Sequence, residues 1–285
     1  MSKWPSDLLR STGKASRKHD EGGRSYRTPY GFLPSVTTIR EKTKSEASQL
    51  KLVNWSKKNP GAKEEASIRG THIHYCSEMH VTGQPYEVDP KYEEYWTGMP
   101  EVLDQFSRVI WAERPLNGDF SYCIGADDIA RVWGSEVDPE TGVIRGWAGA
   151  PDLIGVAGGL TTLADYKTSN SPYCRYFPSK DIKESNPDLF REQMLGWMKY
   201  KSCCIQLAAY GIAIKETLGI EIDQAAVIAC TPKLDKPQIF KLSRKKLDYL
   251  EQDWINLVRK YYAMFDHPNQ DEPEDAVLET VPMAA

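Results

Sequence analysis

Residues 144–169 read IRGWAGAPDLIGVAGGLTTLADYKTS, and the rest of the fold is organised around this stretch. Runs of β-branched, aromatic and alternating apolar residues predict three short strands, over 144–148, 152–156 and 161–167. The Gly158-Gly159 pair predicts a turn that folds the third strand back against the second. The stretch therefore predicts a β-hairpin that is preceded by one further strand.

Acidic and basic side chains are concentrated on the predicted hairpin. Side chains alternate along a strand, so Asp165 and Lys167 are expected on the same face, and the turn lets Asp152 approach Asp165. Two neighbouring carboxylates repel, and a divalent cation between them removes that penalty. Mg²⁺ and Mn²⁺ prefer oxygen ligands, lower the pKa of bound water and stabilise a phosphorane-like transition state.

Lys167 would then orient or deprotonate the attacking water, or neutralise the phosphate. This set of groups favours phosphodiester hydrolysis. The alternative is an ordinary hairpin with surface charges, because a Pro-Asp pair followed by Asp-x-Lys also arises by chance.

Composition limits the class of protein. The 285 residues allow one or two domains, and 40% hydrophobic residues with eight Trp can bury a substantial core. A formal net charge of −4 argues against a surface covered in basic residues but leaves room for a local basic groove. We find neither an apolar run of ~18 residues nor the apolar core of a secretory signal, so we expect a cytoplasmic protein without a membrane partner.

The chain is expected to have three parts: a flexible basic arm over 1–29, one folded domain over 30–266, and a disordered acidic tail over 267–285. Apolar periodicity and cap signals predict helices over 41–58, 63–81, 91–113, 189–218 and 244–265. Further strands are predicted within 119–137 and over 224–230 and 237–242. Gly219 and Ser243 are expected to end and begin the last two helices.

An irregular segment is predicted between Lys167 and the long helix. It interleaves basic and aromatic residues: Tyr173, Arg175, Tyr176, Lys180 and Lys183. Such a pattern suits single-stranded nucleic acid, through base stacking and phosphate pairing. It suits a packed surface loop equally well.

Two helical motifs carry further polar residues. Gln206 and Tyr210 are four positions apart and therefore share a helix face. His72 and His74 are two apart, which places them on different sides of a helix, so a shared zinc ion is not expected.

Four motifs stand in order along the chain: Gly70-Thr71-x-x-His74, Pro151-Asp152, Asp165-Tyr166-Lys167 and Gln206-x-x-x-Tyr210. Together they resemble the RecB-like PD-(D/E)XK nuclease superfamily, most closely its phage-encoded and mitochondrial genome-maintenance exonucleases. The segment PSVTTI at 34–39 is similar to the start of the folded domain in that branch. The resemblance implies an α/β fold: a restriction-endonuclease-like core with a central mixed sheet flanked by helices and a helical region before it.

The resemblance also implies roles for residues. Asp152, Asp165, His74 and the Tyr166 carbonyl would hold Mg²⁺ or Mn²⁺, and Lys167 would assist the water. The residues implied in substrate binding are Gln206, Tyr210, Thr71, Thr168 and Ser169. Glu113 is a candidate for positioning the site residues without contacting the substrate itself. Some relatives carry a four-cysteine iron–sulfur cluster with three of the cysteines near the C-terminus; only Cys230 follows the last of the four motifs here, so no cluster is expected.

The expected activity is that of a metal-dependent DNA exonuclease acting on single-stranded ends in replication, recombination or repair. A phage-encoded enzyme of this kind would act in a host cell, and replication or recombination proteins are candidate partners. Two alternatives stay open: a structure-selective endonuclease that cuts flaps or junctions, and a DNA-end-binding recombination protein that does not turn over. Polarity and oligomeric state stay open as well.

Overall fold

The computed structural model describes residues 17–20, 23–28, 31–112 and 132–265. A mixed five-stranded sheet lies at its centre, in the order β10-β9-β8-β7-β4. The strands are β4 (Phe106–Ala112), β7 (Leu153–Ala157), β8 (Leu160–Thr168), β9 (Gln224–Cys230) and β10 (Gln238–Ser243). Only β8 and β9 pair in parallel, and the three other pairs are antiparallel. The predicted hairpin is therefore β7–β8, and the predicted α/β class with a central mixed sheet is confirmed.

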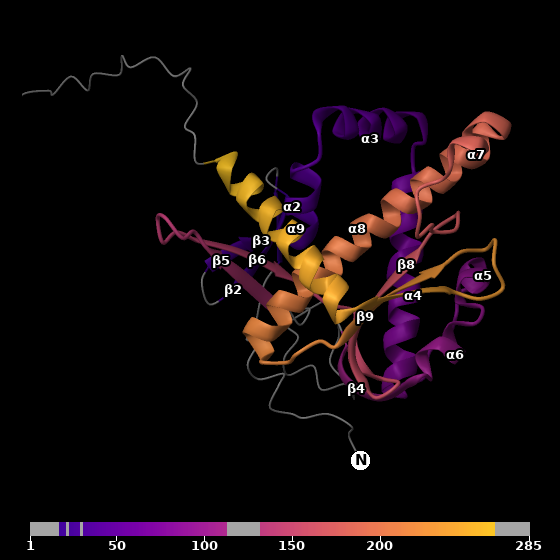
Figure 1. Cartoon of the computed structure of the whole chain (residues 1–285). Helices are drawn as coiled ribbons and strands as arrows, with labels where there is room; N and C mark the ends of the chain where they lie inside the picture. Colours follow the sequence, from indigo (N-terminus) through magenta and orange to yellow (C-terminus); the bar gives the residue numbers. More distant parts are fainter. Residues whose placement is uncertain (1–16, 21–22, 29–30, 113–131, 266–285) are drawn as a thin grey trace, which may run out of the picture.

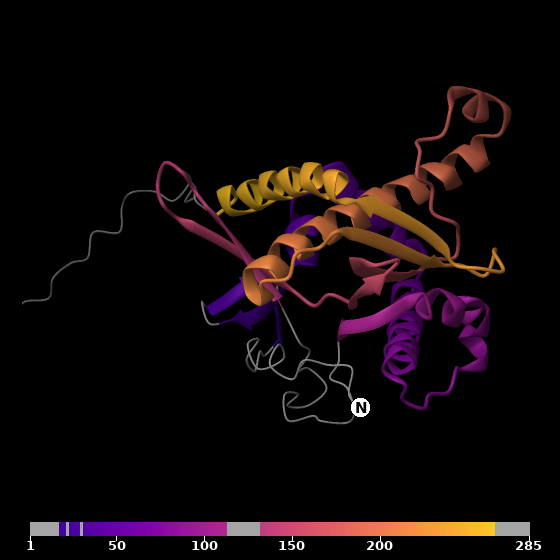
Figure 2. The ribbon, with the colours of Figure 1, turned by 60° about the horizontal axis from the view of Figure 1, so that its bottom comes forward.

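Helices cover both faces of this sheet (Figure 2). One layer holds α8 (Pro187–Leu218) and α9 (Arg244–Ala263), and the other holds α4 (Ala62–Thr82), α5 (Glu93–Trp96) and α6 (Met99–Leu103). The alternation along β8 explains both cores, because Leu163 packs toward α8 whereas Ala164 and Tyr166 pack toward α4. Two hydrophobic cores thus hold β8 between α8 and α4.

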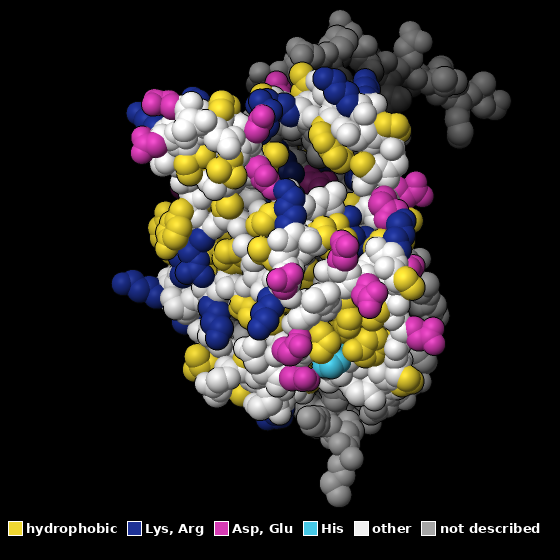
Figure 3. All heavy atoms as spheres, turned by 90° about the vertical axis from the view of Figure 1, so that its right-hand side faces the viewer, with side chains coloured by type: hydrophobic (Ala, Val, Ile, Leu, Met, Phe, Trp, Pro, Cys, Tyr) yellow, Lys and Arg dark blue, Asp and Glu magenta, His cyan; other side chains and the backbone are white. Residues whose placement is uncertain are grey.

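The N-terminal part of the domain packs beside the long helix (Figure 1). Helix α2 (Val36–Lys42) leads to α3 (Glu46–Lys58), which spans the space between α2 and α4. A separate hairpin, β5 (Val132–Val137) with β6 (Ile144–Gly149), contacts α8 and α9. Seen from the side of α5 and α7 (Lys180–Ser185), the surface is hollowed in its upper part (Figure 3).

Part of the segment that we predicted as a flexible arm is ordered. Residues Arg17–Asp20, Gly23–Thr28 and Gly31–Pro34 form the three-stranded sheet β1-β2-β3. Tyr26 is buried, and the carbonyl of Arg24 accepts hydrogen bonds from the Ser35 amide and the Thr38 hydroxyl. The expectation of a flexible arm over 1–29 is therefore wrong over β1 and β2, since α2 anchors β2 to the domain.

The predicted helix over 91–113 is also wrong in its second half, which is strand β4. The pairing of β4 with β7 shifts register twice, and each irregularity interrupts the alternation of inward and outward side chains. Apolar residues at 106, 109 and 110 therefore imitate helical spacing in the sequence. The predicted helix over 41–58 is α3 from residue 46 onward, whereas residues 41 and 42 belong to the end of α2. The segment predicted as irregular contains α7.

The predicted caps of the last two helices are confirmed. Gly219 ends α8 in the left-handed conformation at φ 66°, and the Ser243 hydroxyl accepts a hydrogen bond from the amide of Lys246 at the start of α9. Across the described residues, no helix is both long and apolar enough to cross a membrane.

Candidate active site

Asp165 and Lys167 form a buried ion pair near the carboxyl end of β8. The ammonium nitrogen of Lys167 lies 2.5 Å from Asp165 Oδ2 and donates a hydrogen bond of 3.0 Å to the Tyr166 carbonyl. The Asp165 side chain is 1% exposed whereas that of Lys167 is 24% exposed. Lys167 thus covers the Asp165 carboxylate, and of the two side chains only that of Lys167 is exposed to solvent.

Asp152 and His74 complete this cluster from the neighbouring elements. Asp152 stands just before β7, and its Oδ2 accepts a 2.7 Å hydrogen bond from the Tyr166 amide. His74 reaches in from α4: its Nε2 lies 3.0 Å from the Tyr166 carbonyl oxygen and its Nδ1 lies 3.5 Å from Asp152 Oδ1. The hairpin and α4 therefore bring together the residues that the sequence singled out as metal ligands.

The charges of this cluster compensate one another within the protein. Burial alone would lower the pKa of Lys167, but the carboxylates of Asp165 and Asp152 outweigh it and hold that pKa above its usual value. Lys167 is therefore an ammonium ion at neutral pH. In this structure Lys167 and the Tyr166 amide offset the charge of the two carboxylates, a role that we expected a divalent cation to have; the cation itself stays a prediction.

Gln206 on α8 is fixed between Asp165 and an arginine from α2. Its Nε2 donates to Asp165 Oδ1 and to the Tyr210 hydroxyl, both at 3.1 Å, while its Oε1 accepts from Arg40 Nη1 at 2.7 Å. The second terminal nitrogen of Arg40 donates to the Ser202 hydroxyl. Because the two ends of an amide differ chemically, Arg40 sets the orientation in which Gln206 donates to Asp165.

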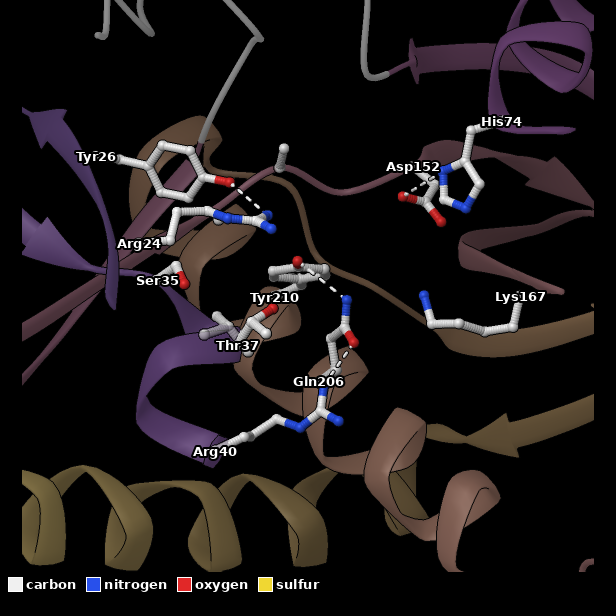
Figure 4. Close-up of a pocket in the computed structure, with 13 residues that line it drawn as sticks. Arg24, Tyr26, Ser35, Thr37, Arg40, His74, Asp152, Lys167, Gln206 and Tyr210 are labelled. Atoms are coloured by element: carbon white, nitrogen blue, oxygen red, sulfur yellow. Dashed lines mark hydrogen bonds and ion pairs between the residues drawn. The ribbon is translucent and has the colours of Figure 1, made fainter. Parts of the chain in front are cut away.

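These side chains face a cavity of about 340 Å³ (Figure 4). His74, Asp152 and Lys167 line one side, Arg24 and Tyr26 line the opposite side, and Gln206 and Tyr210 lie between them. Asp165 is not among the lining residues, because Lys167 lies in front of it. The cavity therefore combines a carboxylate and an imidazole with several cationic side chains.

Arg40 is a site residue that the sequence did not indicate. Its partner Gln206 is 166 positions away, and no local pattern predicts such a contact. Arg24 belongs to the segment that we predicted as a flexible basic arm, and strand β2 directs it into the cavity.

Three of the predicted substrate-binding residues do not line the cavity: Thr71, Thr168 and Ser169. Thr71 is exposed on α4, and Ser169 is buried, with its hydroxyl accepting from Lys199 and donating to the Ser171 carbonyl. Glu113 lies outside the described residues.

The donor atoms suit Mg²⁺ or Mn²⁺ in type, since they comprise two carboxylates, a carbonyl and an imidazole. In the described part of the chain, however, no three His, Cys, Asp or Glu side chains are arranged to hold a metal ion. Asp165 Oδ2 faces the ammonium of Lys167, and the Tyr166 carbonyl lies within hydrogen-bond distance of both Lys167 and His74. The residues therefore fit such an ion in the type of their donor atoms, while two of these oxygens face Lys167 or His74 in this structure.

No family model and no curated protein matches this sequence. Among solved structures, the chain is similar to one from Eubacterium rectale named "Putative exonuclease", with a TM-score of 0.32 and 12% identity over 68% of each chain. A likeness at this level is too weak to assign a family or an activity.

Proposed function

We propose that this protein is a metal-dependent deoxyribonuclease with a PD-(D/E)XK core, acting as an exonuclease on single-stranded DNA ends. One observation carries the proposal: the buried Asp165–Lys167 pair opens, through Lys167, onto a cavity that also holds Asp152, His74 and two arginines. The order of the four sequence motifs supports the same activity.

Each side chain has a role that its surroundings support. The ammonium of Lys167 neutralises charge that develops on the scissile phosphate, since it lines the cavity beside Asp152 and His74. Asp152, Asp165, His74 and the Tyr166 carbonyl would hold Mg²⁺ or Mn²⁺, and the bound ion would lower the pKa of water and stabilise the transition-state charge. Arg24 on the opposite side attracts the DNA backbone.

The test is cleavage of single-stranded oligonucleotides labelled at either end, with Mg²⁺, with Mn²⁺ and with EDTA. We expect stepwise shortening that needs the metal and disappears in Asp165→Ala and Lys167→Ala. Equal activity in the wild type and both variants would overturn the proposal.

A covalently closed circular single strand separates the alternatives. An exonuclease leaves the circle intact, whereas cutting of the circle would point to an endonuclease. Binding of the linear strand without metal-stimulated cleavage would point to a DNA-end-binding protein.

A further inference from the structure

Arg69 is a buried cation that makes no ion-pair contact with a carboxylate in the described part of the chain. It lies on α4, is 7% exposed, and its guanidinium carbon is 4.5 Å from the centre of the Tyr95 ring. Its Nε is buried without a hydrogen-bond partner, and none of the described carboxylates forms an ion pair with it. A buried guanidinium is costly unless an anion compensates it, so Arg69 lacks the partner that its burial requires.

A second cation, Lys199 on α8, lies close to Arg69. Its ammonium donates a 2.8 Å hydrogen bond to the Ser169 hydroxyl and lies 6.0 Å from the centre of the Tyr173 ring. A chain of contacts connects the two cations: the Tyr95 ring lies under Arg69, its hydroxyl donates a 2.9 Å hydrogen bond to Asn170 Oδ1, and Asn170 directly follows Ser169, the partner of Lys199. In keeping with this, partial burial and the neighbouring charge of Arg69 lower the pKa of Lys199.

The carboxylates near this pair are engaged elsewhere. Glu65, one turn before Arg69 on α4, is bound by Lys91 at 2.6 Å. Glu192, near Lys199, is bound by Lys233 at 2.5 Å. Glu65 attracts Arg69 and Glu192 attracts Lys199 from a distance, but the direct ion-pair contact of each acid is with another lysine.

The position of this pair relates it to the candidate active site. Lys199, Cys203, Gln206 and Tyr210 follow the spacing of one face of α8, and Gln206 on that face bonds to Asp165. Lys199 is seven residues before Gln206, roughly 10 Å along the helix axis. Ser169, its partner, follows Lys167 by two residues.

We propose that Arg69 and Lys199 together bind one backbone phosphate of single-stranded DNA, next to the phosphate at Lys167. This inference rests on the proposed nuclease function and gives the strand a second anchoring point. The planar guanidinium, held against Tyr95, supplies two parallel donors, and the ammonium adds a mobile point charge.

Equilibrium binding of a fluorescent oligo-dT strand to the full chain tests this subsite. Binding is measured by anisotropy in EDTA, where no cleavage is expected, over a series of KCl concentrations. The variants are Arg69→Gln, Lys199→Gln and the double variant, with Lys201→Gln as a matched control. Lys201 is also an exposed lysine on α8, and its ammonium lies over the Trp197 ring.

We expect each single variant to weaken binding roughly 3- to 10-fold and to reduce the salt slope, by about 0.7 for one lost phosphate contact. The double variant should lose less than the product of the two single losses, because both side chains hold the same phosphate. Lys201→Gln should bind within about twofold of the wild type. Since Lys199 is exposed, Lys199→Gln tests the site even if Arg69→Gln does not fold.

Three outcomes separate this subsite from the nuclease proposal. If the wild type cleaves DNA but Lys199→Gln and Arg69→Gln bind like the Lys201→Gln control, the subsite is overturned and the nuclease stands. If the wild type never cleaves but the expected losses of affinity occur, the subsite stands and the nuclease fails. Absence of any oligonucleotide binding by the wild type overturns the subsite.

Discussion

Replacing Arg40 by methionine should slow DNA hydrolysis while leaving the fold intact. Arg40 contacts Asp165 only through Gln206, whose Oε1 accepts from Arg40 and whose Nε2 donates to Asp165. Without the guanidinium, the Gln206 amide is free to rotate, and Asp165 loses a donor whose orientation Arg40 had set. The substitution on α2 therefore affects the Asp165 carboxylate on β8 through Gln206 on α8.

The hydrogen bonds involved set the size of the effect. A hydrogen bond to a charged group contributes about 1.5–3 kcal/mol. If that contribution is lost in the transition state, kcat falls by roughly 10- to 150-fold. KM should change little, because a positioning residue acts on the reacting groups and not on ground-state binding.

Steady-state kinetics of a double-mutant cycle measures this coupling. The cycle compares Arg40→Met, Gln206→Leu and the double variant, with Lys44→Met as a control that removes an exposed charge close to α2. The double variant should be no more than about twofold slower than Gln206→Leu, because both changes break the same connection. A thermal unfolding transition measured for each variant checks that it is folded.

Two results would refute this reasoning. Additive losses in the double variant would mean that Arg40 acts independently of Gln206. A rise in KM with an unchanged kcat would mean that Arg40, which lines the cavity, binds the substrate directly.

Three further substitutions or modifications test the packing around the site. Gly149→Ala should destabilise the protein by about 1–3 kcal/mol and reduce activity, because the new Cβ would lie 2.2 Å from the buried ring of Tyr210; urea unfolding measures the loss. Trp254→Ala should cost about 3–5 kcal/mol in the same assay, because Trp254 is fully buried and meets Trp147 edge to face. Burial raises the pKa of Cys203 to about 11, so iodoacetamide should not alkylate it at pH 8 until the protein unfolds; rapid native labelling, seen by mass spectrometry, would contradict its burial.

The local pattern of the sequence was sufficient to predict the hairpin that carries the site. Alternation placed Asp165 and Lys167 on one face, and Gly158 and Gly159 form the turn in the left-handed conformation, at φ 59° and 79°. These features depend only on neighbouring residues and on the stereochemistry of glycine. The approach of Asp152 to Asp165 was also predictable, because the turn folds the strand that follows Asp152 back against the strand that holds Asp165.

Contacts between distant segments were not predictable in this way. Arg40 meets Gln206 because α2 packs against α8, and nothing in the residues around Arg40 specifies that packing. Strand β2 is short and polar, so its sequence resembles an unstructured arm, although Tyr26 is buried. Tertiary packing decided both features.

The charge balance of the site was also beyond sequence reasoning. The sequence shows that Asp152, Asp165 and Lys167 are near one another but not which groups touch. Only the structure shows Lys167 directly on Asp165 and the Tyr166 amide on Asp152. The compensation of two carboxylates by one ammonium and one amide therefore emerged from the geometry.

Single-turnover hydrolysis of an end-labelled single strand in Mg²⁺ tests the central claim most directly. The comparison is between the wild type, Lys167→Met and Lys201→Met, so that the same charge is removed inside and outside the site. We expect Lys167→Met to be slower by roughly 10²- to 10³-fold, as for loss of one group that stabilises transition-state charge, and Lys201→Met to be unchanged. Equal rates for all three proteins would contradict the assignment of the Asp165–Lys167 pair as the hydrolytic centre.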